Sequence, residues 1–106
     1  MEEESLFVKL LGNSPMIKML DFLLTDKDFD YSKKELAENA GISYNTLKSI
    51  FPYLLGNGII AKTRRIGKQD MFRLNMDDAH VKGIAMLFDY LIKSSAENAS
   101  KEKSIA

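Results

Sequence analysis

The chain lacks cysteine altogether and carries a single histidine among its 106 residues. Without cysteine, a disulfide framework, a thiolate nucleophile and a cysteine-ligated zinc site are excluded. His80 has only Asp77 and Asp78 near it as further ligands, which is a weak metal signal, so we expect it to pack at a helix start. The GxGxxG, P-loop and HExxH motifs are also missing, and no nucleophile has a plausible base beside it. We therefore predict neither catalysis, nor a metal site, nor a cofactor.

Long hydrophobic runs are missing as well. No stretch of about 18 uninterrupted apolar residues occurs, so we expect no transmembrane helix. The first residues, Met1-Glu2-Glu3-Glu4, are acidic where a secretory signal would be basic, which predicts a cytoplasmic location. With 106 residues, 45% of them hydrophobic, the chain suffices for one domain with a small core that an oligomer would enlarge.

Net charge is zero, but the charges are unevenly distributed. Residues 1–31 carry three lysines against seven acids, and residues 74–106 four lysines against five acids. Residues 32–73 carry eight lysines and arginines against three acids, a local charge of +5. A polyanion responds to charge within about 8–10 Å, so this middle region is a candidate nucleic-acid surface. Alternatively, the charges serve only to keep the domain soluble.

Apolar residues recur at spacings of three and four, which predicts helices over residues 3–11, 14–25, 32–40 and 44–55, and a last helix capped by Asn75 or Asp77. Ser32 and Glu35 form a capping box at the start of the third helix. Gly41 supplies the positive φ that the turn to the fourth helix needs. Pro52 predicts a kink or a local boundary inside that fourth helix.

Two strands, 59–66 and 69–75, are predicted on either side of Gly67-Lys68 and form a hairpin. Strand alternation would put Lys62 and Arg64 on one face and Arg65 on the other. The tail beginning at Ser94 has no apolar period and is expected to be flexible. The chain thus divides into an N-terminal helix (1–13), a central unit (14–76), a C-terminal helix (77–93) and a tail (94–106).

The order of these elements resembles the winged helix-turn-helix transcription regulators of bacteria and archaea. Residues 35–48, ELAENAGISYNTLK, are similar to the family pattern ELA…AGIS…TL, and LLGNGII at 54–60 is similar to the LLEKGII before the wing. The resemblance covers roughly residues 14–92. It implies a mainly α fold with a small β-hairpin, in which 14–76 is the DNA-binding domain and extra helices lie at both ends.

The resemblance makes helix 44–55 the recognition helix in the major groove and the hairpin 59–75 a wing on flanking phosphates or in the minor groove. Asn45 can bond adenine, Lys48 guanine, and the Thr46 methyl can touch thymine. Relatives often have arginine in the first turn, where this chain has none, so base preference is not transferred. The expected DNA-binding residues are Lys33, Ser43, Tyr44, Asn45, Thr46, Lys48, Ser49, Lys62, Arg64, Arg65, Lys68 and Arg73.

Both sets of polar residues have a plainer interpretation. Asn45 and Ser49 can be solvated side chains on an exposed helix, and the cations of the hairpin can protect an edge strand from aggregation. Clustering of the cations near the turn, with few acids among them, favours phosphate contact.

The terminal helices carry more apolar surface than a small domain covers, which predicts a homodimer. Its expected interface consists of Leu6, Phe7, Leu10, Val81, Ile84, Leu87, Phe88 and Leu91. A dimer would place two recognition helices about 34–36 Å apart, matching half-sites one DNA turn apart. Alternatively, both helices pack on their own domain.

The leading interpretation is therefore sequence-specific binding of double-stranded DNA by a homodimeric transcription regulator. Two alternatives remain: a docking module within a transcription or replication complex, and a non-specific architectural DNA binder. Salt dependence separates the docking module from both kinds of DNA binder, since each phosphate contact steepens the fall of DNA affinity with salt.

Overall fold

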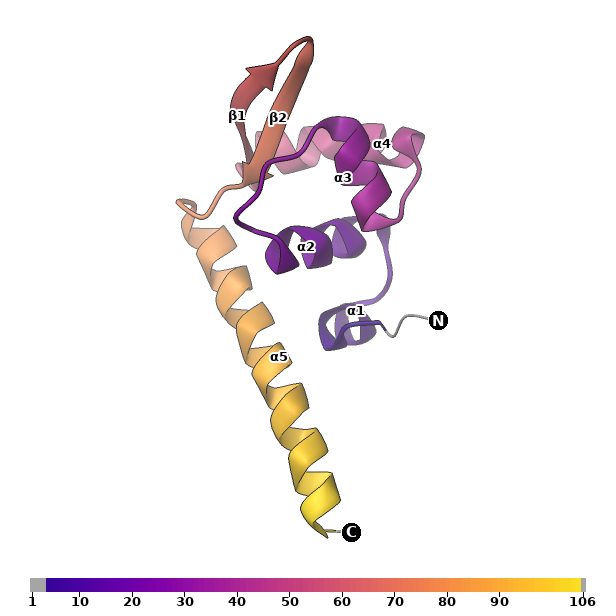
Figure 1. The fold of residues 1–106 in the computed structure, drawn as a ribbon, viewed down its shortest axis with the longest axis vertical. Helices are drawn as coiled ribbons and strands as arrows, with labels where there is room; N and C mark the ends of the chain where they lie inside the picture. Colours follow the sequence, from indigo (N-terminus) through magenta and orange to yellow (C-terminus); the bar gives the residue numbers. More distant parts are fainter. Residues whose placement is uncertain (1–3, 106) are drawn as a thin grey trace.

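The computed structural model describes residues 4–105, with side chains from 4 to 95. In this part of the chain the elements are α1 (Leu6–Leu11), α2 (Pro15–Thr25), α3 (Lys33–Ala40), α4 (Tyr44–Gly56), β1 (Ile60–Ile66), β2 (Gln69–Leu74) and α5 (Ala79–Ile105). The antiparallel hairpin β1–β2 projects from the body, and α5 runs away from it past α1 (Figure 1). The predicted fold class is confirmed. None of the described helices is long and apolar enough to cross a membrane.

The first four helices all begin at a serine. The hydroxyls of Ser5, Ser14, Ser32 and Ser43 each accept a hydrogen bond from the backbone N–H three residues on, which the helix itself leaves unpaired. At Ser32 the backbone N–H also donates to Glu35 Oε1 at 2.9 Å, so the predicted capping box is present. Gly41 ends α3 at φ +72°, as its place in the turn requires.

A single core joins the helices to the base of the hairpin. Leu36 and Leu47, fully buried on α3 and α4, pack in it with α2. Phe72 of β2 meets Phe51 of α4 edge to face, with ring centroids 5.0 Å apart. The tip half of the hairpin makes no such core contact, and all of β1 after Ala61 is exposed.

Two expected helix limits are absent. The local boundary that Pro52 offered does not occur, and α4 is continuous through it, because the proline ring is exposed while the buried residues on either side, Phe51 and Leu54, hold the helix to the core. α5 is capped by Asp78, whose Oδ2 accepts from the Val81 N–H at 3.0 Å. Asn75 is occupied elsewhere, donating to the Gly58 carbonyl at 3.0 Å.

The last helix also differs from expectation at its far end. α5 continues to Ile105, whereas the sequence placed its end at residue 93 and a flexible tail after it. Residues 94–105 contain no glycine or proline, and besides four serines, six of the twelve are alanine, lysine or glutamate. Such residues prolong a helix already nucleated by packing, even without an apolar period of their own.

Candidate nucleic-acid interface

One side of α4 is held by the core and the other is open. Leu47 is fully buried and Ile50 packs against the core. Tyr44, Asn45, Lys48 and Ser49 are exposed at the start of the helix, and Thr46 is half-buried. The Lys48 ammonium lies 5.8 Å from the centroid of the Tyr44 ring, so the two side chains lean together.

The serine hydroxyl groups on this face are already engaged. Ser43 Oγ accepts from the Thr46 N–H at 3.0 Å and donates to Thr46 Oγ1 at 2.8 Å. Ser49 donates to the Asn45 carbonyl at 3.3 Å. The Asn45 amide group has no hydrogen-bond partner among the described residues and is exposed. Asn45 and Lys48 are therefore the side chains of α4 best placed to meet another molecule.

A β-bulge changes which way the cations of the hairpin point. The pairing passes from Lys62 opposite Phe72 directly to Arg64 opposite Met71, which leaves Thr63 as the extra residue. An extra residue reverses the alternation beyond it. The predicted faces are therefore wrong: Lys62 and Arg65 share a face, with nitrogens 3.1 and 3.9 Å from the same oxygen, Asp70 Oδ1.

Arg64 is drawn to a carboxylate far from it in the sequence. Its Nε and Nη2 donate to the two oxygens of Asp30 at 2.8 and 3.1 Å, and Thr63 Oγ1 donates to Asp30 Oδ2 at 2.6 Å. These hydrogen bonds, from Arg64 first and then Thr63, lower the pKa of Asp30 to about 2. The same contact raises the pKa of Arg64.

Three lysines from two segments, together with one acid, Asp70, line a single cleft of about 250 Å³. Lys33 and Lys34 come from the start of α3 and Lys68 from the tip of the wing, while Tyr44 of α4 closes another side. The Lys33 ammonium stands 4.6 Å from the Phe51 ring centroid. Arg73 is not part of this group and lines a different hollow, beside Lys27 and Asp28.

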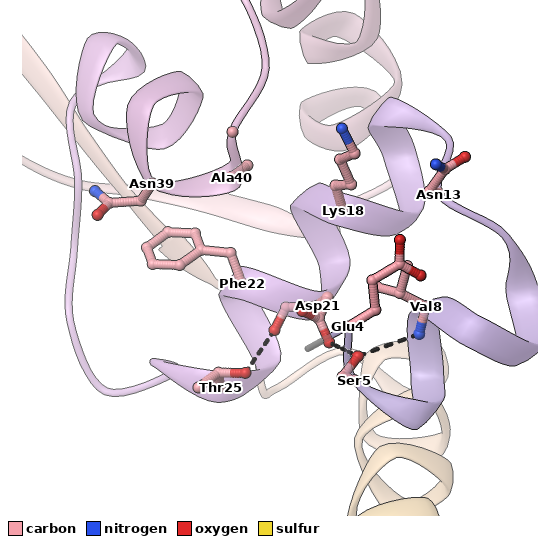
Figure 2. Close-up of a pocket in the computed structure, with 11 residues that line it drawn as sticks. Glu4, Ser5, Val8, Asn13, Lys18, Asp21, Phe22, Thr25, Asn39 and Ala40 are labelled. Atoms are coloured by element: carbon pink, nitrogen blue, oxygen red, sulfur yellow. Dashed lines mark hydrogen bonds between the residues drawn. The ribbon is translucent and has the colours of Figure 1, made fainter. Parts of the chain in front are cut away.

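A further hollow lies away from these cations, between α1, α2 and the end of α3 (Figure 2). Its volume is about 410 Å³, and within it Ser5 donates to Asp21 at 2.6 Å. Glu4 and Lys18 contribute opposite charges, so the hollow has no single sign of charge to attract a polyanion. Across the described residues, no three His, Asp or Glu side chains gather as metal ligands. His80 is 97% exposed at its side chain, contrary to the packing role expected for it.

The residues expected at a dimer interface fall into three groups by burial. Phe7, Val81 and Phe88 are core residues of the chain itself, with the Phe7 and Phe88 rings 5.4 Å apart, so the prediction of an exposed interface is wrong for these three. Leu10 and Leu87 are exposed, and the other three are half-buried: Leu6, Ile84 and Leu91. Met86 and Tyr90, which the sequence did not single out, are the more exposed apolar residues of α5, at 73% and 66%.

No protein-family model matches the chain, and no curated protein matches it. Solved structures do. Reduced HlyU from Vibrio cholerae superposes with a TM-score of 0.58 at 23% identity, covering 79% of this chain and 82% of that one. Mb0332 from Mycobacterium bovis, a homodimeric winged helix-turn-helix DNA-binding domain, gives 0.54 at 22% identity, covering 88% and 78%. This chain has the winged helix-turn-helix fold.

Sso10a-2, a DNA-binding protein from Sulfolobus solfataricus, superposes with a TM-score of 0.52 at 12% identity, covering 83% of this chain and 88% of that one. In this fold α3, the turn at Gly41 and α4 form the helix-turn-helix, and β1–β2 is the wing. The sequence did not reveal Asp30 and Asp70, the partners of the wing cations, or Thr63, which donates to Asp30. Asp30 lies 33 and 34 residues before its partners, a separation at which no local pattern signals a contact.

Proposed function

We propose that this protein binds double-stranded DNA as a homodimeric transcription regulator, with α4 in the major groove and the wing on the flanking backbone. The observation that carries the proposal is the convergence of Lys33, Lys34 and Lys68 beside the open face of α4. A winged helix-turn-helix with its lysines gathered at that place presents both a reading helix and a phosphate-binding surface.

The side chains of α4 that have no hydrogen-bond partner in their own helix make the base contacts. Asn45 offers a donor and an acceptor that match adenine, and Lys48 a donor for the guanine acceptors. Ser43 and Ser49 already donate their hydroxyl protons to partners near by in the chain, so the phosphates at the helix start are bound by the hydroxyls of Tyr44 and Thr46 and by the first backbone amides of α4.

Phosphate contacts come from the cleft and the adjoining wing. Lys33, Lys34 and Lys68 line the cleft, and Lys62 and Arg65 share one wing face with Asp70, so that face keeps a net positive charge. Arg73 would reach only phosphates further along the duplex, since it lies beside a separate hollow.

A second copy would pack on the outer side of α5 and on α1. Leu10, Met86, Leu87 and Tyr90 leave a set of exposed apolar side chains there, at 45–73% exposure. Burying them in a symmetric contact is favourable, and the resulting dimer would address an inverted repeat. Mb0332, described as a possible ArsR-family regulator, is itself homodimeric, which supports a homodimer here.

The test is selection of bound fragments from a random duplex library at low and at moderate salt. We expect an enriched inverted repeat with half-sites about one helical turn apart and affinity that falls as salt rises. Salt-sensitive binding without a motif would instead indicate an architectural protein. No binding at either salt would indicate a docking module.

A matched pair of double variants checks where the DNA binds. Lys33→Ala with Lys68→Ala should weaken binding to every sequence. The slope of log affinity against log salt should fall by the share that roughly two phosphate contacts contribute. Lys82→Ala with Lys93→Ala removes the same charge from exposed positions of α5 and should leave binding nearly unchanged. Equal losses in both pairs would mean that only total charge matters.

A further inference from the structure

We infer that Asp30 holds the wing in its orientation against the helix-turn-helix, and that Arg64 serves this contact and does not bind a DNA phosphate. Asp30 and Arg64 are thus positioning residues for the interface. The inference rests on the proposed DNA binding for its consequence, but the contact itself can be tested without DNA.

The contact, which we call the wing clasp, consists of Asp30, Thr63 and Arg64. Both carboxylate oxygens of Asp30 are used, in a bidentate contact with the guanidinium and a 2.6 Å hydrogen bond from Thr63. The Asp30 side chain is only 15% exposed, although it belongs to a loop. A bidentate, partly covered pair fixes direction as well as distance, unlike a freely moving surface pair.

The backbone beside the clasp ties the same loop to the wing. Tyr31 exchanges two backbone hydrogen bonds with Phe72, both 2.8 Å, and so lies on the edge of β2 opposite β1. From there Asp30 reaches across β2 to the bulge on β1 (Figure 1 shows the segment between α2 and α3 running up to β2). Met71, the β2 residue opposite Arg64, is buried at 7% exposure beneath this crossing.

The clasp lies at a point along the hairpin from which it can fix the orientation of the exposed half. Ile60, Phe72 and Leu74 anchor the base in the core, but β1 is exposed from Lys62 to its end. A two-stranded hairpin without a packed face is marginal in water. The clasp contacts β1 at the bulge, where the core contacts end. A bulge changes the direction of its strand. It therefore sets how far Lys68 stands from Lys33 and Lys34 across the cleft.

The same geometry removes Arg64 from the set of free cations. To reach a phosphate, its guanidinium would have to leave both oxygens of Asp30. The bulge also turns Arg64 away from the face shared by Lys62 and Arg65. A simple electrostatic role for Asp30 makes the opposite prediction: an acid beside a DNA surface should weaken binding, and removing it should strengthen binding.

The experiment compares Asp30→Ala and Arg64→Ala with Asp28→Ala in the full chain. Asp28 is an exposed acid of the same loop with no hydrogen bond or ion pair among the described residues, so its variant removes equal charge without touching the clasp. Backbone ¹H–¹⁵N heteronuclear NOEs of residues 64–69 should fall in the two clasp variants and stay unchanged in the control. Amides of α2 to α4 report on folding in the same spectra. Wing NOEs unchanged in a folded Asp30→Ala protein would overturn the inference.

Binding to a random-sequence duplex gives the second readout. If the freed wing is correctly oriented about a tenth of the time, the Kd of Asp30→Ala rises about tenfold, despite the loss of a negative charge, whereas Asp28→Ala should bind no more weakly than the unaltered protein. Arg64→Ala should raise the Kd by a similar factor, while the slope of log affinity against log salt stays unchanged. Tighter binding by Asp30→Ala, or a slope reduced by about 0.9 in Arg64→Ala, would overturn the inference and make Arg64 a phosphate contact.

The two proposals fail in different ways. If the unaltered protein does not bind DNA, the proposed function is wrong, while the wing NOEs still decide whether the clasp orders the wing. Thr63→Val offers a milder variant that keeps every charge and the β-branched shape. It should lower the wing NOEs less than Asp30→Ala does, because one of the three hydrogen bonds is lost.

Discussion

Among single residues, Asn45 differs from the other polar side chains of α4. Ser43, Thr46 and Ser49 bond within the helix, whereas the Asn45 amide faces solvent. We predict that Asn45→Ala costs about 1–3 kcal/mol of binding free energy on a selected site and little on random duplex, because a bidentate base contact is lost.

Titration of binding by fluorescence anisotropy on both duplexes checks this prediction. Ser49→Ala, one turn along the same helix, is the matched control and should change both affinities little. Equal losses by Asn45→Ala on the two duplexes would remove its base-reading role.

The ionisation of Asp30 makes the free energy of unfolding depend on pH. Its pKa of about 2 in the folded chain lies below the ordinary value of 3.8, so its ionised form stabilises the fold fully above 3.8. As pH falls from 3.8 towards 2, this contribution is lost. We therefore expect the difference in free energy of unfolding between the unaltered protein and Asp30→Asn to shrink over that interval, as measured by urea unfolding at several pH values.

The carboxyl ¹³C shift of Asp30 provides a direct check. Its midpoint should lie near 2 and should rise in Arg64→Ala, since the hydrogen bond from Arg64 is the largest cause of the lowered pKa. A midpoint that stays in place in that variant would mean that another group stabilises the carboxylate.

Among the elements, α4 contains a proline that lowers the stability of the helix. Pro52 removes the hydrogen bond that its N–H would make to the Lys48 carbonyl, yet the helix continues through it. We predict that Pro52→Ala raises the free energy of unfolding by about 1–3 kcal/mol, since the ring is exposed and no core contact is lost.

Chemical denaturation measures this change. Tyr53→Ala, at the next exposed position, is the control and should not stabilise the protein. A Pro52→Ala protein no more stable than the original would show that the ring's restriction of the unfolded chain offsets the missing hydrogen bond.

The whole molecule should be a dimer through α5. Met86 and Leu87 are exposed, so Met86→Asp with Leu87→Asp should leave the protomer folded while placing carboxylates in the apolar contact, where burial is unfavourable. We expect the mass measured by light scattering to fall from twice the chain mass to the 12.0 kDa of one chain.

Lys82→Ala with Lys93→Ala alters the charge of the same helix by the same amount and should leave the dimer intact. Persistence of the dimer in Met86→Asp with Leu87→Asp would move the interface to another surface.

Much of the local structure follows from neighbouring residues. The capping box of Ser32 and Glu35 and the positive φ at Gly41 involve groups within four residues of one another, so the sequence alone predicts them. The order of elements, and with it the fold class, follows from the same short-range patterns. The start of α4 was likewise predictable as the open face, because Leu47 and Ile50 mark the side that must be buried.

The tertiary structure decided what depends on distant partners. The apolar stripe of α5 does not reveal which of its residues meet Phe7 in the chain's own core and which remain free for a second copy. One extra residue at Thr63 reverses the faces of the wing cations, and alternation counted along the strand cannot detect it. Asp30 acquires its role only because folding brings the loop before α3 alongside β2. Local patterns determine which elements form, whereas long-range packing determines which side chains the elements leave available.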